Sequence, residues 1–173
     1  MIRCILFDRD GTLGDLGDVR FPDTFTPFCD IQKVFEKLKN AGYTVGIITN
    51  QSSIARGTGT DYDFNAEFSA YGCDIYEICP HDTQDNCNCR KPKSGMLLSI
   101  CKRLNLRPEN CLVVGDRLSD IECAKNVGAD GILVLTGKGE LEKASVLNAY
   151  PSTKILKRFD YIVSLNEVYT INH

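Results

Sequence analysis

The sequence has no apolar run that approaches the roughly 20 residues needed for a membrane-crossing helix. It also has no excess of basic residues, because its formal net charge at pH 7 is -3. The overall charge therefore gives no reason to expect nucleic acid or an anionic membrane as a partner. No repeat, low-complexity tract or long linker divides the 173 residues, a length that suits one domain with a substantial core. We expect a single domain over residues 1–173 and a small-molecule partner.

Signals for secretion are missing as well. The N-terminal stretch MIRCILFDRDGT has only a short apolar run, interrupted by charges, unlike a signal peptide. The nine cysteines are an odd number, which without such a signal argues against a disulfide framework. We therefore expect a cytoplasmic protein. Six cysteines stand among apolar residues and are predicted to be small buried core residues: Cys4, Cys29, Cys73, Cys101, Cys111 and Cys123.

Short apolar runs alternate with amphipathic segments along the chain. The runs predict strands at 2–7, 43–49, 111–115, 131–135 and 161–164. Apolar residues at helical spacing predict helices from residue 31 towards Gly42, over 94–104 and over 120–128, and a short terminal helix capped by Asn166. Strands that alternate with helices predict an α/β fold with a doubly wound parallel sheet.

Polar residues directly follow three of the predicted strands. Asp8 follows the first, Thr49 and Asn50 follow the second, and Asp116 follows the third. Sheets of this kind bind ligands beyond the carboxyl ends of their strands. Asp8 and Asp10 are two residues apart, so both carboxylates point into one pocket if the backbone stays extended. Two close carboxylates favour a shared cation, and Mg²⁺ suits them because it takes oxygen ligands and keeps waters that a phosphate can replace.

Such a pair of carboxylates suits phosphate ester hydrolysis. A metal and a cationic side chain neutralise the charge of the phosphate. One carboxylate can then attack phosphorus and form an acyl phosphate. The second can protonate the leaving oxygen and afterwards activate water. A solvated acidic turn is the alternative interpretation of the two aspartates taken alone.

Four motifs occur in the order that is typical of the haloacid dehalogenase superfamily: DRDGT, TNQ, RKP and GDRLSD. The chain resembles this superfamily from about Ile2 to Gly137, which implies a Rossmann-type fold. By this resemblance Asp8 is the nucleophile and Asp10 the general acid and base. Asp8, the Asp10 carbonyl and Asp116 would bind Mg²⁺. Asp120 would lie next to these ligands without binding the ion itself.

The resemblance also implies how the phosphoryl group is held. Thr49 and Asn50 would bind it, although capping the following helix is the alternative role for them. Lys91 would neutralise its charge, because the family uses a lysine before proline. Lys93 is the alternative, since both lysines flank Pro92.

The segment CPHDTQDNCNCRKP gathers three cysteines and a histidine, which form a closed tetrahedral set for a structural zinc: Cys79, His81, Cys87 and Cys89. A reactive cysteine cluster is the alternative. The segment resembles the zinc loop of small phosphatases that include the heptose bisphosphate phosphatases and the histidinol phosphatase domain. It leads directly into Arg90 and Lys91, so we expect zinc to hold these two cations in place.

The segments 13–49 and 50–91 have no room for a separate lid, so we expect a protein without a cap domain. Selectivity then depends on the loops GDLGDVRF and QSSIARG and on the zinc loop. Ser52, Arg56 and Arg90 are candidates for substrate binding, because arginine forks match a second phosphate or carboxylate. Arg117 is a further cation beside the metal ligand. A plain surface position is the alternative for Arg56 and Arg90.

The resemblance thus implies a magnesium-dependent phosphatase of carbohydrate metabolism that acts on a small phosphorylated metabolite. D-glycero-D-manno-heptose 1,7-bisphosphate is the first substrate that it implies, and histidinol phosphate is the alternative. A zinc-stabilised binding protein with vestigial motifs is a hypothesis from another class. A phosphotransferase, which would form product only with an acceptor alcohol, is a third.

Overall fold

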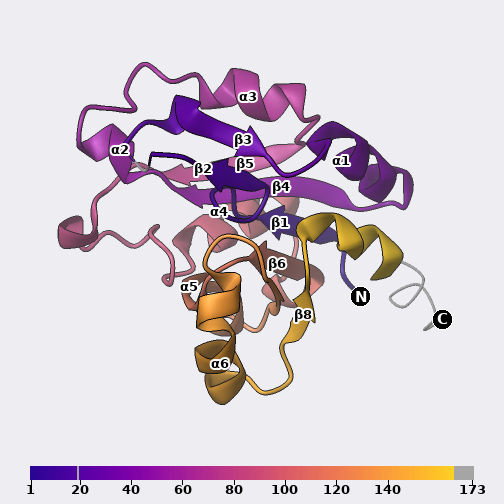
Figure 1. Ribbon diagram of the computed structural model, residues 1–173. Helices are drawn as coiled ribbons and strands as arrows, with labels where there is room; N and C mark the ends of the chain where they lie inside the picture. The colour runs from indigo at the N-terminus through magenta and orange to yellow at the C-terminus, as the bar shows by residue number, and fades with distance from the viewer. Residues whose placement is uncertain (19, 166–173) are drawn as a thin grey trace.

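A computed structural model describes residues 1–18 and 20–165 of the chain. Over these residues a six-stranded sheet with the order β5-β4-β1-β6-β7-β8 forms the centre of the molecule (Figure 1). Each neighbouring pair in it is parallel. The strands are β1 (Cys4–Phe7), β4 (Thr44–Asn50), β5 (Ile75–Cys79), β6 (Cys111–Gly115), β7 (Asp130–Val134) and β8 (Lys154–Leu156).

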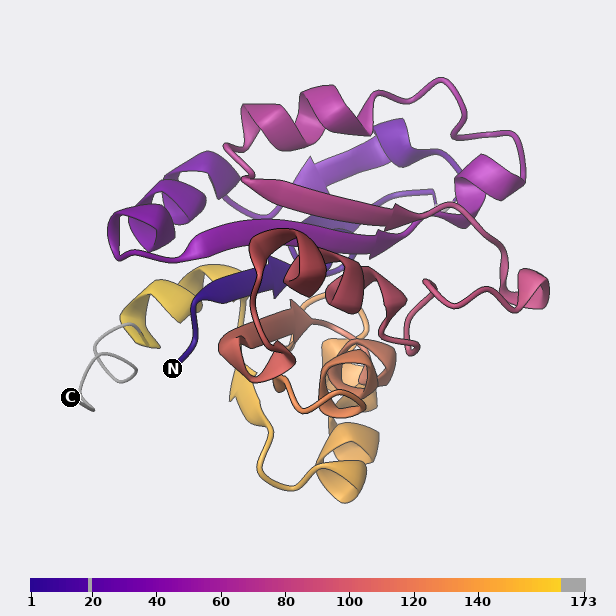
Figure 2. The same ribbon diagram turned by 180° about the vertical axis from the view of Figure 1, so that it is seen from behind.

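Alternate residues of the central strand β1 pack on opposite faces of the sheet. Ile5 and Phe7 pack with α1 (Ile31–Asn40), α3 (Phe64–Ala70) and the 3-10 helix η4 (Phe159–Leu165). Cys4 and Leu6 pack with α4 (Gly95–Leu104) and with α5 (Leu118–Lys125) on the other face. Figure 2 accordingly shows α4 in front of the sheet, whereas it lies behind the sheet in Figure 1. Strands covered on both faces read as continuous apolar runs, and the predicted doubly wound parallel fold is confirmed.

The remaining elements fill the connections between these layers. An antiparallel hairpin of β2 (Gly14–Leu16) and β3 (Phe25–Pro27) lies between β1 and α1. The described connections between β1 and α4 hold only short elements, so no cap domain is inserted there, as expected. None of the helices within 1–18 and 20–165 is long and apolar enough to cross a membrane. The other short elements are α2 (Ser52–Ala55), α6 (Gly139–Ala149), η1 (Pro22–Thr24), η2 (Thr83–Asp85) and η3 (Pro108–Asn110).

One predicted strand was wrong, and some elements of the structure were not predicted. The strand expected at 161–164 is part of η4 instead, because Phe159 and Ile162 stand three residues apart and both insert into the core. Its place at the sheet edge is taken by β8. The predictions also missed β5 and α6, and α6 buries little beyond Val146. The terminal helix expected at Asn166 lies outside the described residues.

The scattered cysteines are free thiols within the fold. Cys4, Cys101, Cys111 and Cys123 are buried as expected. Cys29 and Cys73 are only partly buried, so the prediction of a core position was too strong for these two. All nine cysteines are free thiols in the structure.

Candidate active site

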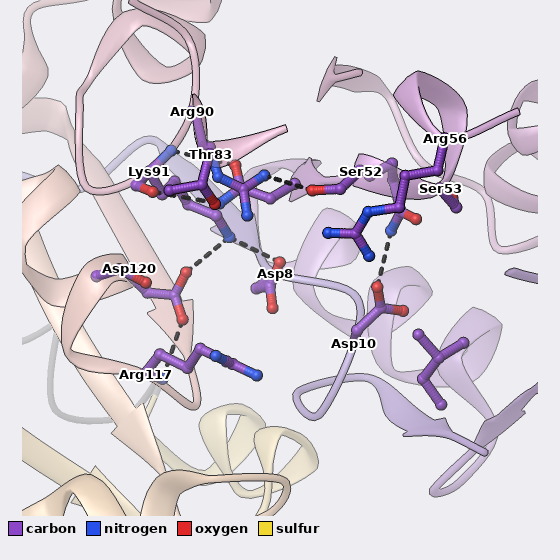
Figure 3. Close-up of a pocket in the computed structure, with 14 residues that line it drawn as sticks. Asp8, Asp10, Ser52, Ser53, Arg56, Thr83, Arg90, Lys91, Arg117 and Asp120 are labelled. Carbon is purple, nitrogen blue, oxygen red and sulfur yellow. Dashed lines mark hydrogen bonds and ion pairs between the residues drawn. The ribbon is translucent and has the colours of Figure 1, made fainter. Parts of the chain in front are cut away.

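A pocket of about 490 Å³ opens at the carboxyl ends of β1 and β4 (Figure 3). Its position follows from the strand register, in which Phe7 of β1 pairs with Ile47 of β4 and Val114 of β6. The residues that follow these strands therefore meet at one edge of the sheet. The pocket is lined by predicted site residues from motifs far apart in the sequence: Asp8, Asp10, Asn50, Ser52, Arg56, Arg90, Lys91, Arg117 and Asp120. Thr49 and Asp116 are buried and do not line it.

Lys91 lies at the centre of this constellation. Its Nζ is 2.6 Å from Asp8 Oδ1 and 2.6 Å from Asp120 Oδ1, and it donates to the Ile48 carbonyl at 2.9 Å. The Lys91 side chain is only 2% exposed. Lys93 points elsewhere and donates to the backbone of the Cys/His loop. The structure therefore places Lys91, and not Lys93, in the pocket.

Three buried carboxylates surround this lysine. Oxygens of Asp8, Asp116 and Asp120 all lie within 4.8 Å of one another. Burial, together with repulsion from the neighbouring aspartates, raises the pKa of Asp8 to about 8, although Lys91 opposes the shift. Burial likewise raises the pKa of Asp116 to about 6. Burial lowers the pKa of Lys91, but the attraction of Asp120 and Asp8 outweighs it and leaves that pKa above its ordinary value. Negative charge exceeds positive charge here, so the site suits a cation.

Asp116 is oriented by the backbone around it. Its Oδ2 accepts the N–H of Lys138 at 2.8 Å, and its Oδ1 accepts the Thr12 hydroxyl at 3.4 Å. Gly11 and Gly137 pass so close that a Cβ on either would collide with Asp116 Oδ2. Both have positive φ angles, 84° and 55°, which favour glycine. The loops after β1 and β7 thus fix this carboxylate.

The raised pKa of Asp8 predicts a pH-dependent stability for the metal-free protein. The folded state keeps a proton on Asp8 up to about pH 8, whereas the unfolded chain loses it near 3.8. This contribution to stability is therefore complete below about pH 4 and is lost as the pH rises towards 8. In thermal melts with a chelator, we expect Tm to fall across this range by about 5 °C more than in Asp8→Asn. Equal pH slopes in the two proteins would contradict this.

Asp10 is held from two sides by residues that the sequence analysis did not single out. Its Oδ1 accepts from Arg9 Nη1 at 2.6 Å, and its Oδ2 accepts from Gln51 Nε2 at 2.8 Å. Gln51 also donates to the Thr49 hydroxyl at 2.9 Å. Gln51 is the last residue of the TNQ motif, so its place after the strand was a usable signal. No comparable signal marked Arg9, because an arginine between two aspartates suggests a solvated turn.

Asn50 of the TNQ motif is hydrogen-bonded to Lys91 of the RKP motif. The Asn50 side chain accepts from the Lys91 N–H at 3.1 Å and donates to the Lys91 carbonyl at 3.2 Å. The two bonds align the backbone of Lys91 beside β4. Asn50 therefore reaches the pocket and at the same time fixes the lysine that enters it.

Ser52, Arg56 and Arg90 lie at the rim of the pocket (Figure 3). Arg90 Nη1 donates to Ser52 Oγ at 2.9 Å and to the His81 carbonyl at 3.1 Å. Arg56 pairs with Asp82 at 2.8 Å in an exposed position, where such a pair contributes little stability. Arg117 adds a further cation to the lining. The rim thus offers several cationic groups to an anion.

The Cys/His loop leads into this rim. The four predicted ligands converge, with sulfur–sulfur distances of 3.4 to 3.6 Å and distances from His81 Nδ1 of 3.2 Å to Cys89 Sγ and 3.6 Å to Cys79 Sγ. A tetrahedral zinc with bonds of about 2.3 Å has sulfur–sulfur edges of roughly 3.8 Å. The cluster is therefore compact enough to hold one ion of that kind.

Comparisons with known proteins show which family the chain resembles. The HAD-hydrolase-like family matches residues 88–160. D-glycero-beta-D-manno-heptose-1,7-bisphosphate 7-phosphatase of Neisseria meningitidis is 37% identical over 150 residues, which are 80% of each chain. The chain belongs to the haloacid dehalogenase superfamily. The enzyme of the same name from Pseudomonas putida is 37% identical over 155 residues, which are 82% of this chain and 89% of the relative.

A solved structure of the superfamily agrees with the fold. D,D-heptose 1,7-bisphosphate phosphatase from B. bronchiseptica, complexed with magnesium and phosphate, has a TM-score of 0.83 and 28% identity. The match covers 99% of this chain and 100% of that one. The predicted membership in the superfamily and the predicted phosphatase class are thus confirmed.

Proposed function

We propose that this protein is a magnesium-dependent phosphomonoester hydrolase that acts on a heptose bisphosphate through an aspartyl phosphate on Asp8. The observation that carries the proposal is the buried ammonium of Lys91, 2.6 Å from Asp8 Oδ1, in a pocket opened by the carboxyl ends of the strands. The names of the relatives and of the B. bronchiseptica enzyme support the substrate.

The carboxylates of Asp8 and Asp116 and the carbonyl of Asp10 are the groups that would hold Mg²⁺. They fit this ion because they offer oxygen donors only, and because Lys91 alone does not balance the buried aspartates. When bound, Mg²⁺ neutralises negative charge on the phosphoryl oxygens. Asp120 is held by Lys91 and by the N–H of Arg117, which suits a supporting role behind the ligands.

The residues of the chain then account for two chemical steps. A carboxylate oxygen of Asp8 attacks phosphorus, the bond from phosphorus to the sugar oxygen breaks, and Asp10 gives its proton to that oxygen. In the second step Asp10, now a carboxylate, takes a proton from water. The resulting oxygen attacks phosphorus, and the bond from phosphorus to Asp8 breaks. Lys91 stays charged throughout and stabilises the negative phosphoryl oxygens.

The rim of the pocket favours a substrate with a second anionic group. Arg56, Arg90 and Arg117 all line the pocket together with the carboxylates. An arginine fork matches a second phosphate, which a heptose 1,7-bisphosphate carries and histidinol phosphate does not.

Phosphate release tests this function directly. With Mg²⁺ present, we expect kcat/KM for D-glycero-D-manno-heptose 1,7-bisphosphate to exceed that for histidinol phosphate by up to about 100-fold, since an arginine–phosphate contact is worth up to about 3 kcal/mol. A chelator should abolish turnover, and Mg²⁺ should restore it while zinc should not. A preference for histidinol phosphate would contradict the substrate. Phosphate transfer only to an added alcohol would favour a phosphotransferase, and no turnover of any ester would favour a binding protein.

A second part of the proposal is a structural zinc in the Cys/His loop. The cluster offers three sulfurs and one imidazole nitrogen, which fits zinc and leaves no position for a reacting water. Lys93 donates to the carbonyls of Asn86 and Cys87, and Arg90 donates to the carbonyl of His81. The loop that would wrap the ion is thus tied to Arg90 at the rim of the pocket, whereas Lys93 lies outside the pocket.

Cys87→Ser tests this role of zinc. We expect the variant to lose most of its zinc and about 100-fold in kcat, because loosely placed cations no longer meet the phosphoryl group. Global stability should fall less, since the loop after Cys79 lies outside the sheet. Zinc content by elemental analysis and kcat for the same sample are the measurements, with Cys29→Ser, a free cysteine outside the cluster, as the matched control. A wild-type protein that carries no zinc after purification without chelators would contradict the proposal. So would a zinc-free variant with full kcat.

A further inference from the structure

Arg9 is a fully buried arginine next to the proposed nucleophile. It lies between Asp8 and Asp10 in the sequence, yet its side chain is 0% exposed. Its Nη1 donates to Asp10 Oδ1 at 2.6 Å. Burying a guanidinium is costly unless partners satisfy it, so the protein must supply them. Arg9 takes no part in the two proposed chemical steps.

The partner that holds Arg9 comes from α3, far away in the sequence. Arg9 Nε donates to Glu67 Oε1 at 2.9 Å, and Arg9 Nη2 donates to Glu67 Oε2 at 2.9 Å, which is a two-pronged ion pair. The hydroxyls of Tyr62 and Tyr71 donate to the same carboxylate at 2.9 and 3.1 Å. Glu67 is therefore fixed in its own position, and its side chain is only 8% exposed.

The hairpin after β1 closes the other side of the guanidinium. Arg9 Nη2 donates to the Pro22 carbonyl at 2.8 Å, and the Phe25 ring centroid lies 4.0 Å from Arg9 Cζ. A cation over a ring face is attracted to it, more so when water is excluded. With these contacts the guanidinium has one orientation, and in that orientation Nη1 faces Asp10.

We propose that Arg9, clamped by Glu67, is a positioning residue that aims the Asp10 carboxyl group at the leaving-group oxygen. The inference rests on the proposed function. Arg9 only donates and keeps its charge, so it holds Asp10 Oδ1 as an acceptor. Asp10 Oδ2 faces the neutral amide of Gln51 and is the oxygen that gives and takes the proton. Figure 3 shows Asp10 across the pocket from Lys91 and Asp120, so its direction depends on this separate support.

The dependence on the leaving group distinguishes this role from a purely structural one. An alkyl phosphate needs its leaving oxygen protonated, whereas 2,4-dinitrophenyl phosphate releases a stable anion without help. For an enzyme that forms an aspartyl phosphate, kcat/KM reports the step in which this bond breaks. We expect Glu67→Gln to lower kcat/KM about 30-fold for the heptose bisphosphate and less than about threefold for the aryl ester.

Two further variants keep the test decisive. Tyr71→Phe removes one donor to Glu67 and leaves the ion pair, so it should give a smaller loss with the same preference for the aryl ester. Asp74→Asn is the matched control, because it removes the ion pair with Lys39 at the opposite end of the sheet, while the asparagine oxygen can still accept the Val45 N–H. It should lower stability and leave the ratio of the two kcat/KM values unchanged.

The outcomes separate the inference from the function. Equal losses for both esters in Glu67→Gln and Tyr71→Phe, or full activity in both variants, would overturn the positioning role while the wild-type turnover upholds the phosphatase. A wild-type protein that hydrolyses neither ester overturns the proposed function, and the inference with it.

Discussion

Asp8→Asn is expected to lower kcat for the heptose bisphosphate by at least about 10⁴-fold, since loss of a covalent nucleophile removes the whole two-step route. The amide has nearly the same shape as the carboxylate but is a poor nucleophile. The fold of the variant should survive, because the backbone N–H of residue 8, which donates to the Val114 carbonyl at 2.9 Å, is unchanged. Phosphate release by the purified variant is the measurement.

The control for this variant is Asp15→Asn in β2, an exposed aspartate close by in the sequence. It should keep wild-type kcat. The Asp8→Asn protein should also yield no acid-labile phosphoprotein after rapid quenching with substrate, whereas wild-type protein should. Near-normal turnover in a folded Asp8→Asn sample would refute the aspartyl phosphate mechanism.

Lys91→Met should have the second largest effect, a loss of kcat of about a thousandfold or more, because the charge on the phosphoryl group is then left without its ammonium. Stability should fall too. The Lys91 ammonium lies 2.6 Å from both Asp8 and Asp120, and breaking a buried pair by removing one partner costs about 3–5 kcal/mol. Denaturant unfolding measures this loss, and Mg²⁺ should recover part of it by replacing the missing positive charge.

Lys93→Met is the matched control, because it removes the same side chain on the other side of Pro92. Lys93 is exposed and donates only to the Asn86 side chain and to loop carbonyls. We expect a change in kcat of less than about threefold. The reverse result, with Lys93→Met inactive and Lys91→Met active, would transfer the proposed role to Lys93.

Local patterns in the sequence were sufficient for the central fold. The runs at 2–7, 43–49, 111–115 and 131–135 became β1, β4, β6 and β7, because strands buried on both faces must be continuously apolar. The edge strand β8 of the sheet was harder to predict. β8 is short and only partly buried, so its sequence carries little of this signal, and the more apolar run after it became the 3-10 helix η4.

By itself the sequence determined which reactive groups follow which strand, since Asp8, Asn50 and Asp116 each follow an apolar run and parallel strands bring such ends together. It also determined the compact Cys/His set, because those ligands lie within one short segment. Only the tertiary structure placed Lys91 and not Lys93 in the pocket, because the two side chains on either side of Pro92 leave the backbone in different directions. Only it joined Arg9 to Glu67, 58 residues away, because that contact depends on how α3 packs over the hairpin.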